Sequence, residues 1–326
     1  MRERFSNNSL TSQICSLVVV TLISGSVSAQ SATNETGKAE ISTMEKKGPP
    51  TGWGVAVSGG YVHQFDTDID NGGSFSKNSS IIQAGVRYAF TPDSSAAFSV
   101  GYGFENYDFS GSTGFGGANP WSDVSTLRIG MPVIWGVGED WKVFVIPTVR
   151  FQGETGASFG DSLSGGGFVG FSYKVNDKLT IGPGFGAITQ LEDTPTYFPV
   201  LIIEWKISEK WNLSTGRGLG ATLGPGLTLG WKPLEEWRFG IGARYDKTRF
   251  RLNDNRTLAP NGVGEDRSQP VFLSAEYSPK PEISISVVGG MQVGGELKLD
   301  DQNGNQLSQT DYEAGPFVGF TFNLRF

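Results

Sequence analysis

The sequence offers little that could perform acid–base catalysis. It contains a single histidine, His63, and a histidine base must lie within reach of the group that it deprotonates. On an extended strand His63 alternates in step with Val55, Val57 and Tyr61, which places it on the apolar face. We therefore expect that the protein is not an enzyme and that it uses no cofactor.

Three alternating aspartates resemble the start of a calcium-binding loop. Asp66, Asp68 and Asp70 have the spacing of its first ligands, but Asn71 occupies the position that needs glycine and Lys77 that of the bidentate glutamate. An EF-hand is therefore excluded, and we expect no metal site. A solvated acidic loop is the simpler interpretation. Loose calcium binding in an outer loop is the alternative.

Charged residues of both signs recur on the other face of the alternating segments, between small polar residues. Buried charges must be paired or hydrated, because isolating them is costly. They therefore predict either a hydrated lumen of mixed charge or a network of ion pairs that fills a narrower one. The set comprises Arg87, Glu105, Arg128, Arg150, Lys174, Glu204, Lys206, Arg238, Arg244, Asp246, Glu276, Glu296, Glu313 and Arg325.

The elements that would position these charges are strands with one apolar face. From Tyr312 through Phe320 to Phe326, apolar or small residues occupy every second position, and the opposite face carries Glu313. This pattern is typical of a bacterial outer-membrane β-barrel, whose closing strand faces lipid on one side and a lumen on the other. The ending resembles the C-terminal signature of that class, which implies that Phe326 helps the barrel assembly machinery to recognise the chain.

The amino terminus predicts export. Arg2 and Arg4 precede an apolar run at residues 14–23, and Val27-Ser28-Ala29 forms a small-residue cleavage site. We therefore divide the chain into a signal peptide at 1–29, a polar periplasmic leader at 30–52 and a barrel at 53–326, located in the outer membrane. Cys15 is the sole cysteine and falls within the signal peptide.

The composition agrees with a large closed sheet. Glycine accounts for 46 of the 326 residues, charged residues for 18%, and the net charge is −7. An acidic chain does not fit nucleic acid, which requires a basic surface.

Alternating segments from Trp53 onward predict an all-β fold, a transmembrane antiparallel up-and-down β-barrel of about 14 strands. The hairpin between Trp211 and Trp231 is the weakest of these segments, so about 12 strands is the alternative. Short connections, such as 137–140 and 233–236, predict periplasmic turns. Long polar ones predict outer loops, at 66–78, 110–120, 154–163, 252–268 and 300–309.

Tryptophans flank three of the short turns in pairs. The pairs are Trp135 and Trp141, Trp205 and Trp211, and Trp231 and Trp237, each with both members on the apolar face. Indole rings favour the boundary between lipid and water. The pairs therefore predict a periplasmic aromatic girdle, with ordinary core tryptophans as the alternative.

Two further features concern the lumen. Arg217 has the parity of the lipid-facing side, and we predict that its neighbours Gly216 and Gly218 allow a bulge that turns it inward. The lumen parity also includes apolar side chains that would suit an amphipathic or aromatic solute. These are Phe144, Phe168, Phe198, Phe272 and Phe317.

Two stretches, RLNDNRTLAPNGVGEDRSQP and GGELKLDDQNGNQLSQTDYEAGPFVGFTFNLRF, resemble an uncharacterised family of bacterial outer-membrane barrel domains. The likeness is clearest over the last third of the chain. It implies a barrel in the outer membrane and carries over no substrate or catalytic residue. Within it, Gly264-Glu265-Asp266-Arg267 predicts a fixed outer loop that folds into the mouth, or an ordinary charged loop.

Two functions follow from this sequence. The first is a passive, porin-like channel for small solutes through a mixed-charge lumen. A lumen of about 14 strands is too wide for side chains alone to fill, which favours this function. The alternative is a non-conducting barrel that docks other envelope components through its long loops. The identity of the solute does not follow from the residues.

Overall fold

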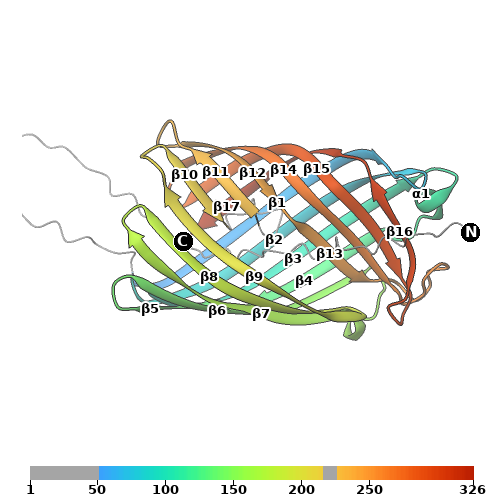
Figure 1. Cartoon of the computed structure of the whole chain (residues 1–326), viewed down its shortest axis with the longest axis horizontal. Coiled ribbons are helices and arrows are strands. Elements are labelled where there is room, and N and C mark those ends of the chain that lie inside the picture. The colour runs from blue at the N-terminus through green and yellow to red at the C-terminus, as the bar shows by residue number, and fades with distance from the viewer. Residues whose placement is uncertain (1–50, 216–225) are drawn as a thin grey trace, which may run out of the picture.

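The computed structural model describes residues 51–215 and 226–326. The expected signal peptide, nearly all of the expected leader, and Arg217 with its predicted bulge lie outside these residues. The described chain forms one closed antiparallel sheet (Figure 1). Its strands are β1 (Gly52–Asp68), β2 (Ser74–Thr91), β3 (Ser94–Ser110), β4 (Asp123–Gly130), β5 (Val133–Val137), β6 (Trp141–Glu154), β7 (Leu163–Asn176), β8 (Leu179–Gln190), β9 (Asp193–Lys206), β10 (Trp211–Thr215), β11 (Gly226–Trp231), β12 (Trp237–Arg244), β13 (Asp246–Arg251), β14 (Val263–Lys280), β15 (Ile283–Asp300), β16 (Gln306–Tyr312) and β17 (Gly315–Arg325).

Three transmembrane strands are each interrupted once. β4 and β5 are separated at Met131 and Pro132, β12 and β13 at Tyr245, and β16 and β17 at Glu313 and Ala314. In each case both pieces pair with the same neighbouring strand. Counted in this way the ring has 14 strands, which confirms the predicted barrel. The weakest predicted hairpin is present as β10 and β11, so the twelve-stranded alternative is wrong.

The ring closes between its first and last strands. β1 pairs antiparallel with β17 from Ala56 opposite Arg325 to Gln64 opposite Phe317. Phe326 extends this pairing, because its backbone exchanges hydrogen bonds of 2.8 and 2.9 Å with Val55. Closure leaves neither of these strands with an exposed edge.

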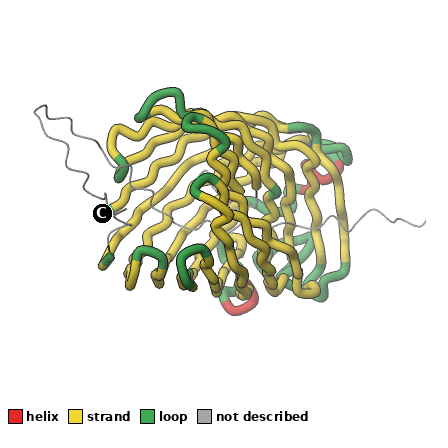
Figure 2. Tube along the Cα trace, turned by 60° about the vertical axis from the view of Figure 1, so that its left-hand side comes forward, coloured by secondary structure: helices red, strands yellow, loops and turns green. Residues whose placement is uncertain are grey.

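Short turns gather at one end of the barrel and longer connections at the other, as Figure 2 shows, and we call the end with the longer connections the outer end. Several outer connections are shorter than the polar composition predicts. β1 continues to Asp68, β2 begins at Ser74 and β14 begins at Val263. Polar residues continue the ladder here because backbone hydrogen bonds, and not apolar side chains, hold strands together beyond the lipid-facing belt.

Two connections at the outer end contain short helices, where the sequence predicts none. α1 (Gly114–Ala118) lies between β3 and β4, and the 3₁₀ turn η1 (Gly160–Ser162) lies between β6 and β7. α1 stops at Asn119, which adopts a left-handed conformation with φ of 44°. Among the described residues, none of the helices has the length and hydropathy to cross a membrane.

Side chains alternate between an apolar outer surface and a mixed interior. The outer residues include Ile82, Val86, Phe98, Val145 and Phe320, all of them exposed. The inner residues form three buried apolar clusters at different places along the lumen. An apolar belt that faces outward and polar groups that face inward are the arrangement expected for a barrel in lipid.

Candidate functional site: the lumen and its outer mouth

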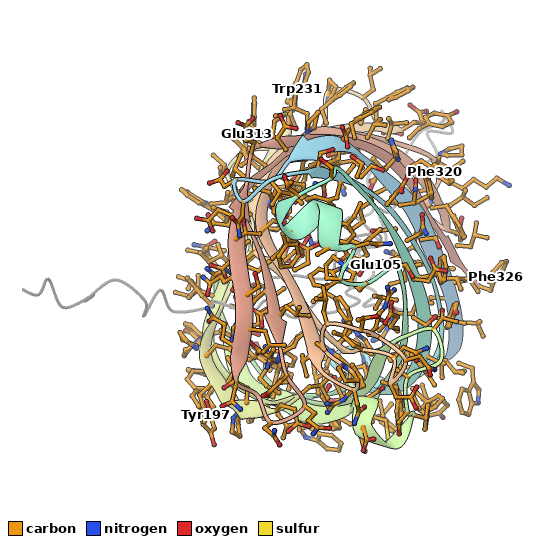
Figure 3. The ribbon with its side chains drawn as sticks, turned by 90° about the vertical axis from the view of Figure 1, so that its right-hand side faces the viewer. Glu105, Tyr197, Trp231, Glu313, Phe320 and Phe326 are labelled. Carbon is orange, nitrogen blue, oxygen red and sulfur yellow. The ribbon has the colours of Figure 1, made fainter. Side chains whose placement is uncertain are left out.

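Most of the charged residues predicted to face the lumen are buried or half-buried on the inner face. These are Arg87, Glu105, Arg128, Arg150, Lys174, Glu204, Arg238, Arg244, Asp246, Glu276 and Glu296. Figure 3 looks into the barrel from the outer end and shows Glu105 pointing inward. Lys206 and Arg325 are exposed, close to the short turns.

The prediction that Glu313 faces the lumen is wrong. Its side chain is exposed and lies outside the barrel wall (Figure 3). Tyr312, in contrast, is expected on the outer face but is buried inside. The cause is the interruption between β16 and β17, where Glu313 and Ala314 leave the ladder and shift the alternation. From Gly315 the predicted alternation holds, with Phe317 inside and Phe320 outside.

The prediction of an outer loop at Gly264–Arg267 is wrong, because these residues form part of a strand. These residues open strand β14 and pair with β13, from Phe250 opposite Gly264 to Lys247 opposite Arg267. We call residues 246–268, which comprise β13, the start of β14 and their connection, the mouth hairpin. The segment does lie in the mouth, as one of the two predictions has it, but it forms part of a strand and not a loop.

The mouth hairpin reaches across the barrel. Arg251 of β13 forms a parallel bridge with Gly153 of β6, although β7 to β11 separate these strands around the ring. The Arg249 Nε donates to the carbonyl of Leu191 at 2.8 Å, and the Arg251 Nε to that of Asp161 at 3.0 Å. These hydrogen bonds join β13 to the opposite wall, so the hairpin must cross the outer mouth of the barrel to form them. The hairpin therefore narrows the outer mouth.

Asp266 of the hairpin receives three side-chain donors from other strands. Its carboxylate lies 2.5 Å from the Lys77 Nζ on β2 and 2.9 Å from the Tyr107 hydroxyl on β3. The hydroxyl of Tyr312 on β16 donates to its other oxygen at 3.1 Å. Asp266 is 4% exposed, so these donors replace the water that a buried carboxylate loses.

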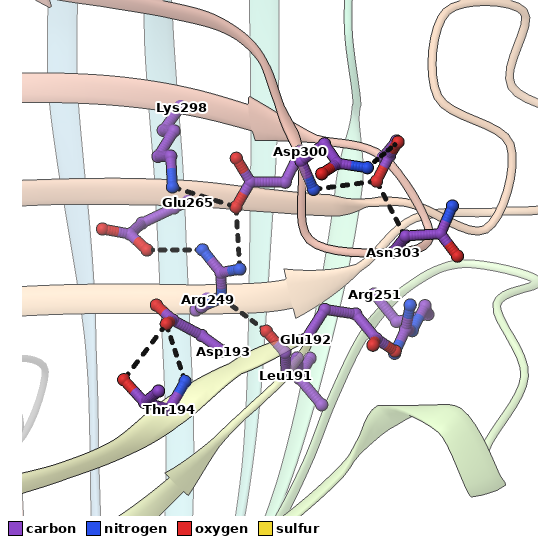
Figure 4. A network of polar contacts seen from close by, with 12 residues as sticks. Leu191, Glu192, Asp193, Thr194, Arg249, Arg251, Glu265, Lys298, Asp300 and Asn303 are labelled. Carbon is purple, nitrogen blue, oxygen red and sulfur yellow. Dashed lines mark hydrogen bonds and ion pairs between the residues drawn. The ribbon is translucent and has the colours of Figure 1, made fainter.

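Arg249 forms the centre of a second buried network, shown in Figure 4. Its guanidinium lies 2.9 Å from Glu265 on β14 and 2.8 Å from Asp300 on β15. Lys298 lies 3.1 Å from the same oxygen of Asp300. Arg249 and both carboxylates are buried, and Lys247, 3.0 Å from Glu265, and Lys298 supply the further positive charges beside the two carboxylates.

A third polar contact fixes the tip of the hairpin to the wall formed by β6. The Arg256 Nε donates to both oxygens of Glu154, at 2.9 and 3.0 Å. The same carboxylate accepts the backbone N–H of Asn253 and of Ser122, each at 3.0 Å. Glu154 is 4% exposed and has a full set of donors.

Apolar side chains fill the space between these polar contacts. Trp121 and Phe250 are fully buried and meet edge to face, with ring centroids 5.3 Å apart. Tyr107 lies 6.2 Å from Phe250 by the same measure. Tyr107 lies on β3 and Phe250 on β13, which are far apart around the ring of strands, so the aromatic layer also spans the mouth.

Deeper in the lumen, apolar residues line two parts of the wall. Phe144, Phe168 and Phe198 pack together with aliphatic neighbours on β6 to β9. Phe272 and Phe317 pack with Val62 and Val288 on the opposite wall. All five phenylalanines predicted to face the interior are therefore buried inside.

The six predicted girdle tryptophans lie on the outer surface beside the short turns. Each is between 39% and 58% exposed, and Trp211 and Trp231 stack at 6.1 Å across β10 and β11. Phe326 is 77% exposed at the same end, at the closing pair of strands (Figure 3).

His63 and the aspartate run do not form a reactive centre. His63 lies beside Tyr61 on the outer side of β1, with its Nδ1 2.9 Å from the Asn78 Oδ1. Asp66, Asp68 and Asp70 are exposed. In the part of the chain that the structure describes, no group of three or more His, Cys, Asp and Glu side chains could hold a metal.

Sequence reasoning missed the residues that organise the mouth. Glu265, Asp266 and Asp300 fall in segments that the sequence predicts as polar loops, and Arg249 lies just before the first of these segments. A signal was present in the alternation of Lys247, Arg249 and Arg251. It is weak, because a strand that crosses a mouth is buried on both faces and loses the contrast between an apolar and a polar side.

Solved barrels are similar to the chain at low identity. The COG4313 outer membrane channel from Pseudomonas putida F1 is 11% identical, with a TM-score of 0.47 over 88% of this chain and 100% of that one. A Pseudomonas aeruginosa FadL homologue is 12% identical, with a TM-score of 0.46 over 83% and 90%. The Pseudomonas putida toluene transporter TodX is 9% identical, with a TM-score of 0.38 over 85% and 90%. The fold itself rests on the strand pairing of this chain.

Family profiles match both halves of the chain, whereas no curated protein matches it. Residues 40–121 match a family whose description refers to the MetA pathway of phenol degradation. Residues 141–325, more than half of the chain, match another family throughout the second half of the barrel. The chain therefore belongs to the family described as Domain of unknown function (DUF6268), a family of transmembrane β-barrels of the outer-membrane type.

Proposed function

We propose that this protein is a channel of the bacterial outer membrane that passes small solutes through its lumen. The observation that carries the proposal is the pair of half-buried arginines, Arg128 and Arg150, on the inner wall of a ring of 14 strands. A barrel of this size is wider than one that side chains alone can fill. Half-buried charges at mid-wall require water beside them, and water in a lumen provides a path for solutes.

The mouth hairpin would limit this path at the outer end. It is bound to opposite walls through Asp266, Arg249 and Arg256, and the aromatic rings of Trp121 and Phe250 lie between these contacts. A solute would have to pass beside the hairpin or displace it. We therefore propose a narrow channel with low conductance.

Small aromatic or amphipathic molecules are the solutes that this lumen suits best. Phe144, Phe168 and Phe198 present apolar surface in the lumen next to charged and polar positions on the same strands. The match of residues 40–121 to a family described by phenol degradation supports an aromatic solute.

Planar-bilayer recording of the purified, refolded barrel tests the channel. We expect steady single-channel steps that persist at constant voltage, with amplitudes that increase with salt concentration. A barrel whose folded state is verified by its heat-modifiable mobility, and which gives no steps over many insertions, would contradict the channel.

Silence in that experiment would favour the second candidate, a barrel that docks other envelope components. The observation that favours a docking barrel is the set of buried contacts across the mouth. Such contacts could seal the lumen, and a sealed barrel does not conduct. Replacing Arg256 by Ala separates the two candidates. A channel should open further when the contact with Glu154 is lost, and a sealed docking barrel should stay silent.

A further inference from the structure

Arg128 and Arg150 form a pair of like charges side by side on the lumen wall. They lie directly opposite each other in the register of β4 and β6. Residues opposed in this way have Cβ atoms about 5 Å apart, and like charges on directly opposed residues destabilise a sheet. Something other than sheet stability must therefore account for the pair.

The structure provides neither arginine with an acidic partner. The Nε atoms of Arg128 and Arg150 are buried without a hydrogen bond, and among the described residues none forms an ion pair with either guanidinium. The nearest carboxylate along β6 on the same face, Glu154, is bound by Arg256 and by two backbone N–H groups. On β3, Glu105 is four residues from Gly101, the partner of Arg128, which is about 13 Å along a strand.

Small residues flank the pair on both sides and leave space in front of it. Gly101 of β3 lies in register with Arg128, and Ser164 of β7 lies in register with Arg150. A methyl group built on Gly101 would touch only side-chain and backbone atoms at 3.6 Å or more. Two guanidiniums with small neighbours present a set of donors that fits a carboxylate.

Apolar surface begins on the same strand, toward the short turns. Thr148, Ile146 and Phe144 follow Arg150 on the inner face of β6, and Ile146 lies opposite Phe168 of β7. The distance from Arg150 to Ile146 is about 13 Å along an extended strand. An anion with an apolar body could therefore bind its charge at the arginines and lay its body toward this cluster.

We propose that Arg128 and Arg150 form a binding site for small organic carboxylates with an apolar body. This inference deepens the proposed channel function by naming the solute class. It does not depend on conduction, because a closed barrel could also bind such a ligand from the periplasmic side.

Calorimetric titration of the detergent-solubilised barrel with benzoate at low ionic strength tests the site. We expect wild-type protein to bind benzoate and to bind benzyl alcohol, its neutral analogue, much more weakly. The variant Arg128→Gln/Arg150→Gln should lose at least about tenfold in affinity, the effect of removing charge-assisted hydrogen bonds. Lys142→Gln is the matched control, because Lys142 also faces inward but is paired with Asp93 at 2.8 Å near the short turns. It should leave the affinity unchanged.

Inorganic phosphate separates a carboxylate site from a general anion site. Phosphate binding as tight as that of benzoate would contradict the apolar part of the proposal. Benzoate binding that is absent from wild-type protein, or equally weakened in the double and the Lys142 variants, would overturn the site. Benzoate binding without conductance would support the site and contradict the channel. Conductance without benzoate binding would support the channel and contradict the site. Gel mobility before and after heating verifies that each variant is folded.

Discussion

Arg249 and Asp300 form an ion pair with a 2.8 Å contact between β13 and β15, and both side chains are almost completely buried. β14 lies between these two strands and contributes Glu265 to the same guanidinium at 2.9 Å. The contact thus joins three successive strands inside the mouth. It also fixes the base of the hairpin before the hairpin crosses to the opposite wall.

Replacing Arg249 by Met should destabilise the barrel strongly. The substitution removes the cation that Glu265 and Asp300 share and leaves each buried carboxylate with one partly exposed lysine, Lys247 or Lys298. Removal of one partner from a buried ion pair costs about 3–5 kcal/mol, which is the upper bound here because the lysines remain. Thermal unfolding in detergent, followed by the loss of heat-modifiable mobility, measures the change. Lys174→Met is the control, since Lys174 pairs with the exposed Asp177 and its loss should change little. Equal unfolding temperatures for the two variants would contradict the role of the buried network.

Phe250 should control how far the mouth is open. Its ring is fully buried between Trp121 and Tyr107, and truncation to Ala leaves a cavity where the hairpin meets the opposite wall. We expect Phe250→Ala to raise single-channel conductance or the frequency of open events in planar bilayers. Phe320→Ala removes an exposed ring from the outer surface and should leave conductance unchanged. Unaltered conductance in Phe250→Ala would show that the hairpin does not limit passage.

The sequence predicted the wall of this barrel better than its mouth. Along the membrane-spanning strands, burial alternates with a period of two, so the inward position of Arg128, Arg150 and Phe144 follows from parity alone. Lipid imposes that contrast on every strand that it touches. The count of 14 strands was accessible for the same reason.

Beyond the lipid, nothing requires one face of a strand to be apolar, so the alternation in the sequence no longer predicts which side chains face inward. Glu313 and Tyr312 exchange faces because two residues leave the ladder between β16 and β17, and a polar sequence gives no sign of such a shift. Within the mouth hairpin, residues 249–251 and 263–266 are buried on both faces and show no contrast between an apolar and a polar side, so the sequence predicts Asp266 as a loop residue and gives Arg249 no role. Their partners, Asp300 and Lys77, are distant in sequence and become neighbours only when the ring closes.

Gly186 should tolerate no side chain. It lies opposite Phe198 in the register of β8 and β9, and a Cβ built on it would approach the Phe198 ring to 2.0 Å. Phe198 is 2% exposed and packs within its buried cluster. Gly186→Ala should therefore cost about 1–3 kcal/mol, the range for overpacked cores. Thermal unfolding provides the measurement, with Gly165→Ala as control, because the nearest atom to its added Cβ is 3.8 Å away. A neutral Gly186→Ala would mean that the apolar cluster in the lumen repacks freely.

The placement of the long connections at the cell surface can be tested with single cysteines. Cys15 is the sole cysteine of the sequence and falls in the expected signal peptide, so an introduced thiol would be unique in the processed chain. Ser158 lies in the connection between β6 and β7, and Glu235 lies in the short turn between β11 and β12. In intact cells that produce the protein, a membrane-impermeant maleimide should label Ser158→Cys and spare Glu235→Cys, and both should react after lysis. Labelling of position 235 in intact cells would contradict the prediction that the short turns are periplasmic, because it places these turns and the tryptophans beside them on the outside.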